Sequence, residues 1–273
     1  MTNRSSYSAC AIALTAAITL LPATAAFAED APTVEVNPLT VSAELGVLLK
    51  TGNVKSADFK AGLKLRHEKD QWLQLLSIDM LGKKLETEDE EGVKSFDTTD
   101  SKWAVAAQSN YTIEPDGNNY LYGNLSYAED RFSSFDLQSS VAMGWGRNWY
   151  KTEKVSLFAD IGPGYKHDVI SAIGATATDP AMPTESQDAF IIQAQALYIN
   201  QINPYVEFRQ YLVGKYAPDS EQNSIYKSET SLTTKLMESL QFKFSLTFDY
   251  NTEVGEEFEN LDTQTAMTLV YSF

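Results

Sequence analysis

Thiols, imidazoles and basic side chains are scarce in this chain. Its 273 residues include one cysteine and two histidines, and 21 lysines and arginines stand against 37 aspartates and glutamates, for a formal net charge of −16. A single cysteine excludes a disulfide framework and a thiolate metal site. The acidic surplus argues against nucleic-acid binding, which depends on Lys and Arg neutralising phosphates, and against a basic patch that docks on anionic lipid.

A long apolar run is found only near the start, from Ala9 to Leu21. It follows the basic Arg4 and precedes the small-x-small pattern Ala26-Phe27-Ala28, and together these features predict a cleaved signal peptide over residues 1–28. The run is short for a membrane helix, which needs about 20 apolar residues. Cys10 lies inside it, too early for a lipoprotein cleavage site. We therefore expect an exported protein whose mature chain has no cysteine.

The rest of the chain alternates between apolar and polar residues with period two, which is typical of strands. The clearest case is 241–251, where one face reads Phe242, Phe244, Leu246, Phe248 and Tyr250. In two segments the pattern does not decide which face points outward: 71–82 is apolar on both faces, and 222–236 is rich in hydroxyl groups. Twelve segments are predicted in all: 39–50, 54–67, 71–82, 99–113, 119–130, 136–150, 155–168, 187–199, 204–213, 222–236, 240–251 and 262–273.

The connections between these segments alternate between short and long. Short ones include 69–70 and 115–118, and long ones include 83–98 and 169–186. Outer-membrane barrels have an even strand number, short periplasmic turns and longer outer loops. We therefore predict an all-β fold: one antiparallel transmembrane barrel over 39–273, with about 12 strands, both termini periplasmic and a short periplasmic lead over 29–38. The alternative is a soluble β-sandwich or a periplasmic barrel, whose strands also alternate.

The predicted partners follow from this placement. Aromatic residues fall near the segment ends, where membrane-interface girdles lie. The terminal Phe273 follows an alternating strand and suggests the signal read by the barrel-assembly machinery. The remaining expected partners are outer-membrane lipid and lipopolysaccharide, with small polar solutes as candidates. The acidic stretches near 86–91 and 253–259 could bind divalent cations, but they lack calcium-loop spacing and are read as solvated loops.

Four motifs resemble a known family in order and spacing: Thr51-Gly52-Asn53, Glu129-Asp130-Arg131-Phe132-Ser133, Gly162-Pro163-Gly164-Tyr165 and Val270-Tyr271-Ser272-Phe273. Together they are similar to the YdiY-like salt-induced outer-membrane proteins over residues 39–273. The resemblance implies an outer-membrane barrel of poorly defined molecular function with a link to osmotic conditions. It implies no catalytic residue and no cofactor.

If the apolar faces meet lipid, the charged residues of the strands must face the lumen, because Arg or Lys at mid-membrane costs about 2–4 kcal/mol. They would form either a network of ion pairs that plugs the barrel or the lining of a narrow polar channel. The positive charge is concentrated in segments two and four, and this suggests that such a channel prefers small anionic solutes. The candidate residues are Lys60, Lys64, Arg66, Lys102, Asp160, Glu207, Arg209, Lys243 and Asp249.

Enzymatic chemistry finds little support. His67 and His167 are far apart in the segment order, so we expect no metal site. A barrel hydrolase would need a serine, a histidine and an orienting polar group on one face. Asp168 follows His167 directly and therefore points to the opposite face; Ser133 or Ser186 could supply the hydroxyl. We therefore predict a non-enzymatic barrel, a structural or envelope-stress protein with slow passage of polar solutes, and keep the anion porin and the hydrolase as alternatives.

Overall fold

A computed structural model describes residues 38–48, 56–88, 94–115, 117–130, 135–170, 185–219, 221–254 and 259–272. Every regular element in these ranges is a strand, and no helix there is long and apolar enough to cross a membrane. The strands are β1 (Leu39–Leu48), β2 (Ser56–Lys69), β3 (Trp72–Glu88), β4 (Lys94–Thr112), β5 (Asn119–Asp130), β6 (Phe135–Lys151), β7 (Val155–Ile170), β8 (Glu185–Asn203), β9 (Val206–Tyr216), β10 (Ile225–Lys235), β11 (Leu240–Asn251) and β12 (Leu261–Ser272).

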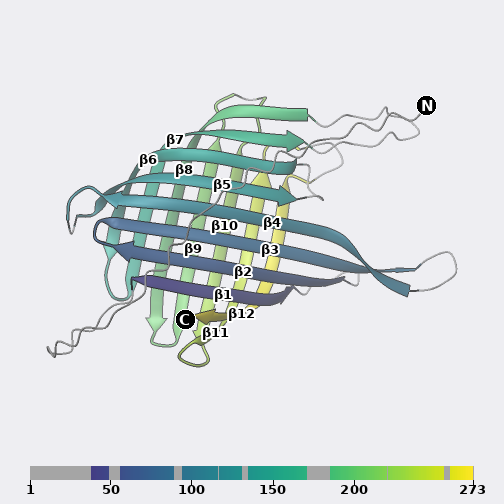
Figure 1. Cartoon of the computed structure of the whole chain (residues 1–273), viewed down its shortest axis with the longest axis horizontal. Coiled ribbons are helices and arrows are strands. Elements are labelled where there is room, and N and C mark those ends of the chain that lie inside the picture. Colours follow the sequence, from purple (N-terminus) through teal and green to yellow (C-terminus); the bar gives the residue numbers. More distant parts are fainter. Residues whose placement is uncertain are drawn as a thin grey trace, which may run out of the picture. The chain divides into compact units, whose positions relative to one another are not determined.

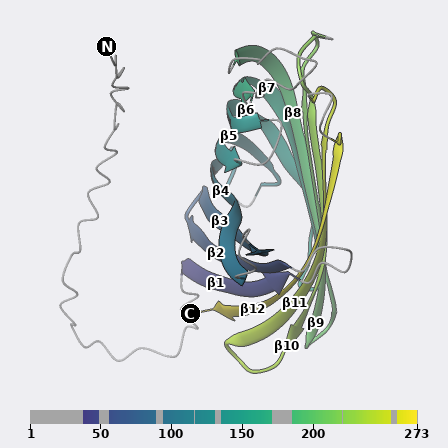
Figure 2. The same cartoon turned by 90° about the vertical axis from the view of Figure 1, so that its right-hand side faces the viewer.

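The twelve strands form one closed antiparallel barrel in which each strand pairs with its neighbours in sequence. The barrel closes where β1 pairs with β12, from Ser42 opposite Ser272 to Val47 opposite Met267. Figure 1 shows the strands of one wall crossing in front of those of the other, and Figure 2 shows β1 to β7 along one wall and β9 to β12 along the facing wall. The prediction of a single barrel of about twelve strands is confirmed.

The hairpin of β3 and β4 is longer than its apolar pattern predicts. The segment 83–98 reads as a polar loop in the sequence, yet the ladder continues to Glu88 opposite Lys94, with an irregularity between Lys83 and Lys84. Backbone hydrogen bonds alone are enough to extend a hairpin that has already been started, so the pairing does not need the apolar face that marks the rest of the strand. The prediction of a loop over the whole of 83–98 is therefore wrong, because 83–88 and 94–98 belong to strands.

Connections at the opposite end of the barrel, here called the short-turn end, are tight. Between β2 and β3 the turn consists of Asp70 and Gln71, because Lys69 pairs directly with Trp72. Asp70 has a φ of 55°, the left-handed conformation that a two-residue hairpin demands and that Asp tolerates better than most residues. The end of the barrel with the longer connections is called the long-loop end. The predicted periplasmic side of the short turns stays a prediction, and residues 1–37 and Phe273 lie outside the described residues.

Candidate functional site

The two faces of the barrel wall differ sharply in polarity. Leu45 and Met143 expose 68% and 65% of their surface on the outside, whereas Glu44 and Ala142, next to them in sequence, are buried inside. Exposed large apolar side chains on strands β1 to β12 repeat this pattern, and the buried polar side chains point inward. A soluble barrel would present its polar face to solvent. The candidate site is therefore the lumen.

The structure settles the faces that the sequence left open. On β3 the outward face carries Trp72 and Met80, so Leu75 points inward; on β10 Tyr226 and Leu232 point outward. The nine predicted lumen residues all have the inward parity of their strands: Lys60, Lys64 and Arg66 on β2, Lys102 on β4, Asp160 on β7, Glu207 and Arg209 on β9, and Lys243 and Asp249 on β11.

Four of the lumen charges form a cluster next to the closing pair of strands, here called the seam cluster. Lys64 Nζ lies 2.7 Å from Glu44 Oε1, and Lys243 Nζ lies 2.9 Å from Glu229 Oε1 and 3.7 Å from Glu44 Oε2. Lys60 acts electrostatically on the same two carboxylates. The cluster joins β1, β2, β10 and β11, and its signs balance. It therefore ties the strands on both sides of β12 together.

Local ion pairs outside this cluster hold five further predicted charges: Arg66, Lys102, Glu207, Arg209 and Asp249. Arg66 lies 2.5 Å from Glu68, Lys102 lies 3.2 Å from Asp130, and Arg209 lies 3.7 Å from Glu207. Asp249 lies 3.5 Å from Lys227. Each of these positive charges has an acidic neighbour. The lumen thus has no continuous track of positive charge through these residues.

Asp160 occupies the centre of a different cluster, made of neutral side chains. The register places Tyr120, Gly146, Asp160 and Gln195 in one row across β5, β6, β7 and β8. A Cβ atom at Gly146 would lie 2.3 Å from the Tyr120 ring and 2.6 Å from Asp160 Cβ, so only glycine lets the ring pass over β6. The Tyr120 hydroxyl then donates to Asp160 Oδ2 at 3.2 Å.

Gln108 on β4, the strand next to β5, also belongs to this cluster. Its Nε2 donates to Asp160 Oδ2 at 3.3 Å, while Gln195 Nε2 donates to Asp160 Oδ2 at 2.9 Å and to Gln108 Oε1 at 2.6 Å. Tyr211 donates to Gln195 Oε1 at 3.0 Å. These bonds connect β4 with β7, β8 and β9 through the lumen. Asp160 and Gln195 are 4% and 7% exposed, so side chains fill the barrel at this level.

A second row adjoins the first and contains two glycines. Tyr122 on β5 is opposite Gly144, and Gly162 is opposite Gln193 on β8. The two glycines face each other: a Cβ at Gly162 would lie 2.0 Å from the Met143 carbonyl oxygen and 2.6 Å from Gly144 Cα. No side chain therefore stands between Tyr122 and Gln193 on the lumen face. Their buried oxygens, Tyr122 Oη and Gln193 Oε1, have no hydrogen-bond partner among the described residues, and neither does Asp160 Oδ1.

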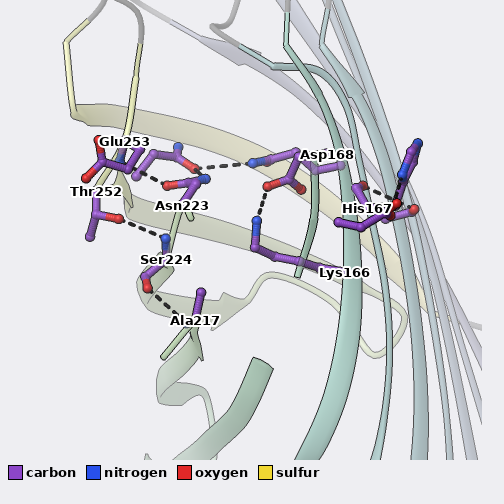
Figure 3. A network of polar contacts seen from close by, with 12 residues as sticks. Lys166, His167, Asp168, Ala217, Asn223, Ser224, Thr252 and Glu253 are labelled. Carbon is purple, nitrogen blue, oxygen red and sulfur yellow. Dashed lines mark hydrogen bonds and ion pairs between the residues drawn. The ribbon is translucent and has the colours of Figure 1, made fainter. Parts of the chain in front are cut away.

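A third polar group lies toward the long-loop end (Figure 3). Lys166 pairs with Asp168 two residues further along β7, and both are buried. Gln138 Nε2 on β6 donates to Asn251 Oδ1 on β11 at 3.3 Å, and Asn223 Nδ2 donates to the same oxygen at 2.9 Å. This group links strands that are not neighbours in the barrel, so it narrows the lumen a second time.

The histidines are not part of the lumen. Figure 3 shows His167 on the opposite side of β7 from Lys166 and Asp168, and its Nδ1 lies 2.8 Å from Asp188 Oδ1 on the outer face. Ser139, opposite His167 on β6, donates its hydroxyl to the His167 backbone carbonyl oxygen at 3.3 Å and not to the ring. His67 has the outward parity of β2. No group of three or more His, Cys, Asp or Glu that could hold a metal is found in the described ranges.

Two cavities lie on the barrel. A shallow groove of about 640 Å³ runs over the outer face between Trp145 and Tyr250 and has small residues such as Ala194 and Gly214 in its floor. A smaller cavity of about 310 Å³ opens at the short-turn end and is lined by lumen-facing residues that include Glu207 and Lys235. The second cavity places charged residues at the entrance of the lumen.

Sequence reasoning missed the neutral members of the lumen because it searched for charges. The sequence does contain a signal for the inward position of Gln108, Gln193 and Gln195. Each of these glutamines alternates with outward apolar residues; on β8, for example, the outward residues are Phe190 and Ile192. Tyr120 also has inward parity, but an aromatic ring in an alternating segment reads as lipid-facing. Only the register shows that it reaches Asp160 across a glycine.

Comparisons with known proteins agree with the resemblance seen in the motifs. The chain is 23% identical to the Escherichia coli (strain K12) uncharacterized protein YdiY over 89% of this chain and 86% of that protein. The fold is similar to the translocator domain of the autotransporter NalP from Neisseria meningitidis, with 9% identity, a TM-score of 0.50 and coverage of 87% of this chain and 89% of that one.

An outer membrane channel from Pseudomonas putida F1 also matches, with 10% identity, a TM-score of 0.48 and coverage of 90% of this chain and all of that one. The likeness to the NalP domain shows a shared β-barrel fold. A family profile described as "Protein of unknown function, DUF481" matches residues 43–273, nearly the whole barrel. The chain belongs to this DUF481 family and is a YdiY-like member of it.

Proposed function

We propose that the chain is a non-enzymatic outer-membrane barrel that acts as a narrow channel for small polar solutes. One observation carries the proposal: the lumen is lined with polar side chains and bridged by them, as in the hydrogen bond from Gln195 on β8 to Gln108 on β4. A twelve-stranded barrel has a backbone radius of roughly 12 Å, and long side chains that reach inward from opposite walls take up most of that space. Passage is then slow and limited to small solutes.

The alternative of a porin for anionic solutes has less support. Three of the four positive residues that suggested it are paired: Lys64 with Glu44, Arg66 with Glu68 and Lys102 with Asp130. The fourth, Lys60, acts electrostatically on Glu44 and Glu229 of the seam cluster. Paired charges of opposite sign cancel beyond a few ångströms, so they create little field along the pore. The balanced seam cluster supports a structural role for its members, which hold the barrel closed at β1 and β12.

The hydrolase alternative also has less support. Acyl transfer by a serine needs its hydroxyl hydrogen-bonded to the histidine ring. Of the two serines expected to supply the hydroxyl, Ser133 lies outside the described residues, and Ser186 on β8 is opposite Val169, not His167. The described bond to the ring of His167 comes from Asp188, and Ser139, which is opposite His167, gives its proton to a backbone carbonyl. We expect purified protein to cleave no lipid ester, and His167→Ala to leave any background hydrolysis unchanged. The link to osmotic conditions rests on the family resemblance, and transcript levels at high and low salt would test it.

Planar-bilayer conductance of the refolded protein tests the channel. We expect small, discrete openings in the wild type, and a severalfold larger conductance in Gln108→Ala/Gln195→Ala, because two bridging side chains are removed from the lumen. Gln210→Ala is the matched control: Gln210 bonds to Ser228 and Thr230 on the outward face, so its loss leaves conductance unchanged. If wild type and double variant both fold, as heat-modifiable gel mobility reports, and both remain electrically silent, the barrel is a scaffold.

A further inference from the structure

Asp160 differs from the other buried lumen carboxylates because it has no positive partner. Glu44 pairs with Lys64, Glu229 with Lys243 and Asp168 with Lys166. Asp160 forms no ion pair in the described part of the chain, and its three hydrogen bonds come from two amides and a phenol. A carboxylate buried without a counter-charge is costly, so it must be balanced by a proton or by a cation from outside the chain.

The surroundings of Asp160 offer oxygens to such a cation. All three donors bond to Oδ2, so Oδ1 is left free, and the unpartnered oxygens of Tyr122 and Gln193 lie in the adjoining row. Tyr122 and Gln193 are 4% and 1% exposed, so water outside the barrel does not reach these atoms. Buried polar atoms are nearly always satisfied in folded proteins. Three that are not belong to two adjoining rows of the lumen, beside a carboxylate that has no ion pair, and they point to a missing ligand.

The glycine pair makes room for that ligand. Gly144 and Gly162 form the floor between Tyr122 on β5 and Gln193 on β8, and Asp160 precedes Gly162 by two residues on the same face of β7. A water molecule could satisfy the oxygens but would leave the charge of Asp160 unbalanced. Calcium sites gather six to eight oxygens, several of them from carboxylates, and only one carboxylate is present here. A single charge with amide and phenol oxygens suits a monovalent cation, and carboxylates and amide-type oxygens also line cation-conducting pores.

We propose that Asp160, Tyr122 and Gln193 bind one alkali-metal cation, Na⁺ or K⁺, inside the barrel lumen. The site deepens the proposed channel function by making its narrowest part prefer cations. Binding is measured without conductance, so the two proposals can fail separately. A barrel that is silent in bilayers but binds the cation keeps this site and loses the channel. A barrel that conducts but binds no cation keeps the channel and loses this site.

Thermal unfolding of the full refolded chain in detergent is the first test. NaCl, KCl and N-methylglucamine chloride are compared at equal ionic strength, because a ligand that binds only the folded state stabilises it. We expect the unfolding temperature to rise by about 2–4 °C or more in Na⁺ or K⁺. Asp160→Asn removes this difference. Asp249→Asn, a lumen carboxylate that already pairs with Lys227, keeps it.

Location of the ion is the second test, and it needs no variant. Crystals of the wild-type protein grown with Tl⁺ or Rb⁺ should show an anomalous scattering peak beside Asp160 Oδ1. Equal unfolding temperatures in all three salts, or an anomalous map without a peak there, would overturn the proposal and leave a proton as the balancing charge. Asp160→Asn offers its own amide protons to Tyr122 and Gln193, so we expect it to fold.

Discussion

At the scale of single residues, burial decides what a charge in this barrel contributes. Lys243 and Lys227 are both lumen lysines in the β10–β11 pair, and each faces a carboxylate. The Lys243 side chain is 7% exposed and touches Glu229 and Glu44, whereas the Lys227 side chain is 37% exposed and lies 3.5 Å from Asp249. Water can replace the ammonium group in the second pair but not in the first.

We therefore expect Lys243→Met to lower the free energy of unfolding by about 3–5 kcal/mol, because it removes this cation from the buried Glu44 and the half-buried Glu229. Lys227→Met, the control, should lower it by about 0–1 kcal/mol, as exposed pairs do. Urea unfolding followed by tryptophan fluorescence measures both. Equal losses in the two variants would mean that the seam cluster is hydrated and carries no special weight.

At the scale of elements, the pairing of β1 with β12 closes the molecule. Among the described residues, this pair has six residues on each strand in register, fewer than any other pair of strands, and Leu45 is opposite Leu269 on the outer face. Directly opposite residues in an antiparallel pair have Cα atoms about 4.5–5.5 Å apart, within the range that a disulfide spans.

We predict that Leu45→Cys/Leu269→Cys forms a disulfide on oxidation, which a shift in gel mobility under denaturing, non-reducing conditions reports. Leu45→Cys/Thr265→Cys is the control: it moves one thiol four residues along β12, about 13 Å away, and should stay reduced. Efficient cross-linking of the control, or none in the first variant, would show that the barrel closes in another register or not at all.

The strand pattern also shows which features of the strands can be predicted from the sequence. Alternation alone places twelve strands and the inward parity of Lys64 and Asp160. It fails for the extension of β3 and β4 to Glu88 and Lys94, because backbone pairing continues there without an apolar face. It also leaves β10 undecided, since hydroxyl side chains are accepted on either face; Tyr226 and Leu232 settle the face only once their neighbours are known.

At the scale of the whole molecule, the apolar surface points outward in a band around the barrel. All four tryptophans belong to this surface: Trp72, Trp103, Trp145 and Trp149 are 36–56% exposed. Trp72 and Trp149 lie near the short-turn end, whereas Trp145 lies closer to the middle of β6. A soluble barrel would expose such residues to water at a considerable cost in free energy.

In lipid vesicles we expect lipids brominated on their acyl chains to quench most of the tryptophan fluorescence, with Trp145→Phe removing a larger share of the quenched signal than Trp149→Phe. Iodide in the aqueous phase should quench weakly. Strong iodide quenching together with little effect of bromine would place the apolar face in water and support the soluble alternative. The same vesicles, probed at different bromine depths, order the tryptophans across the bilayer.

The sequence by itself determined the strand number, the faces of most strands and the inward position of the charges. A period of two is a local property, and it follows from the geometry of one strand. Partners across the lumen were decided only by the tertiary structure. Register and closure bring Gln108 to Gln195 and Lys243 to Glu44, residues far apart in the chain. They also leave Asp160 as a buried carboxylate without an ion pair in the described strands, because its three hydrogen-bond partners come from three different strands and are all neutral.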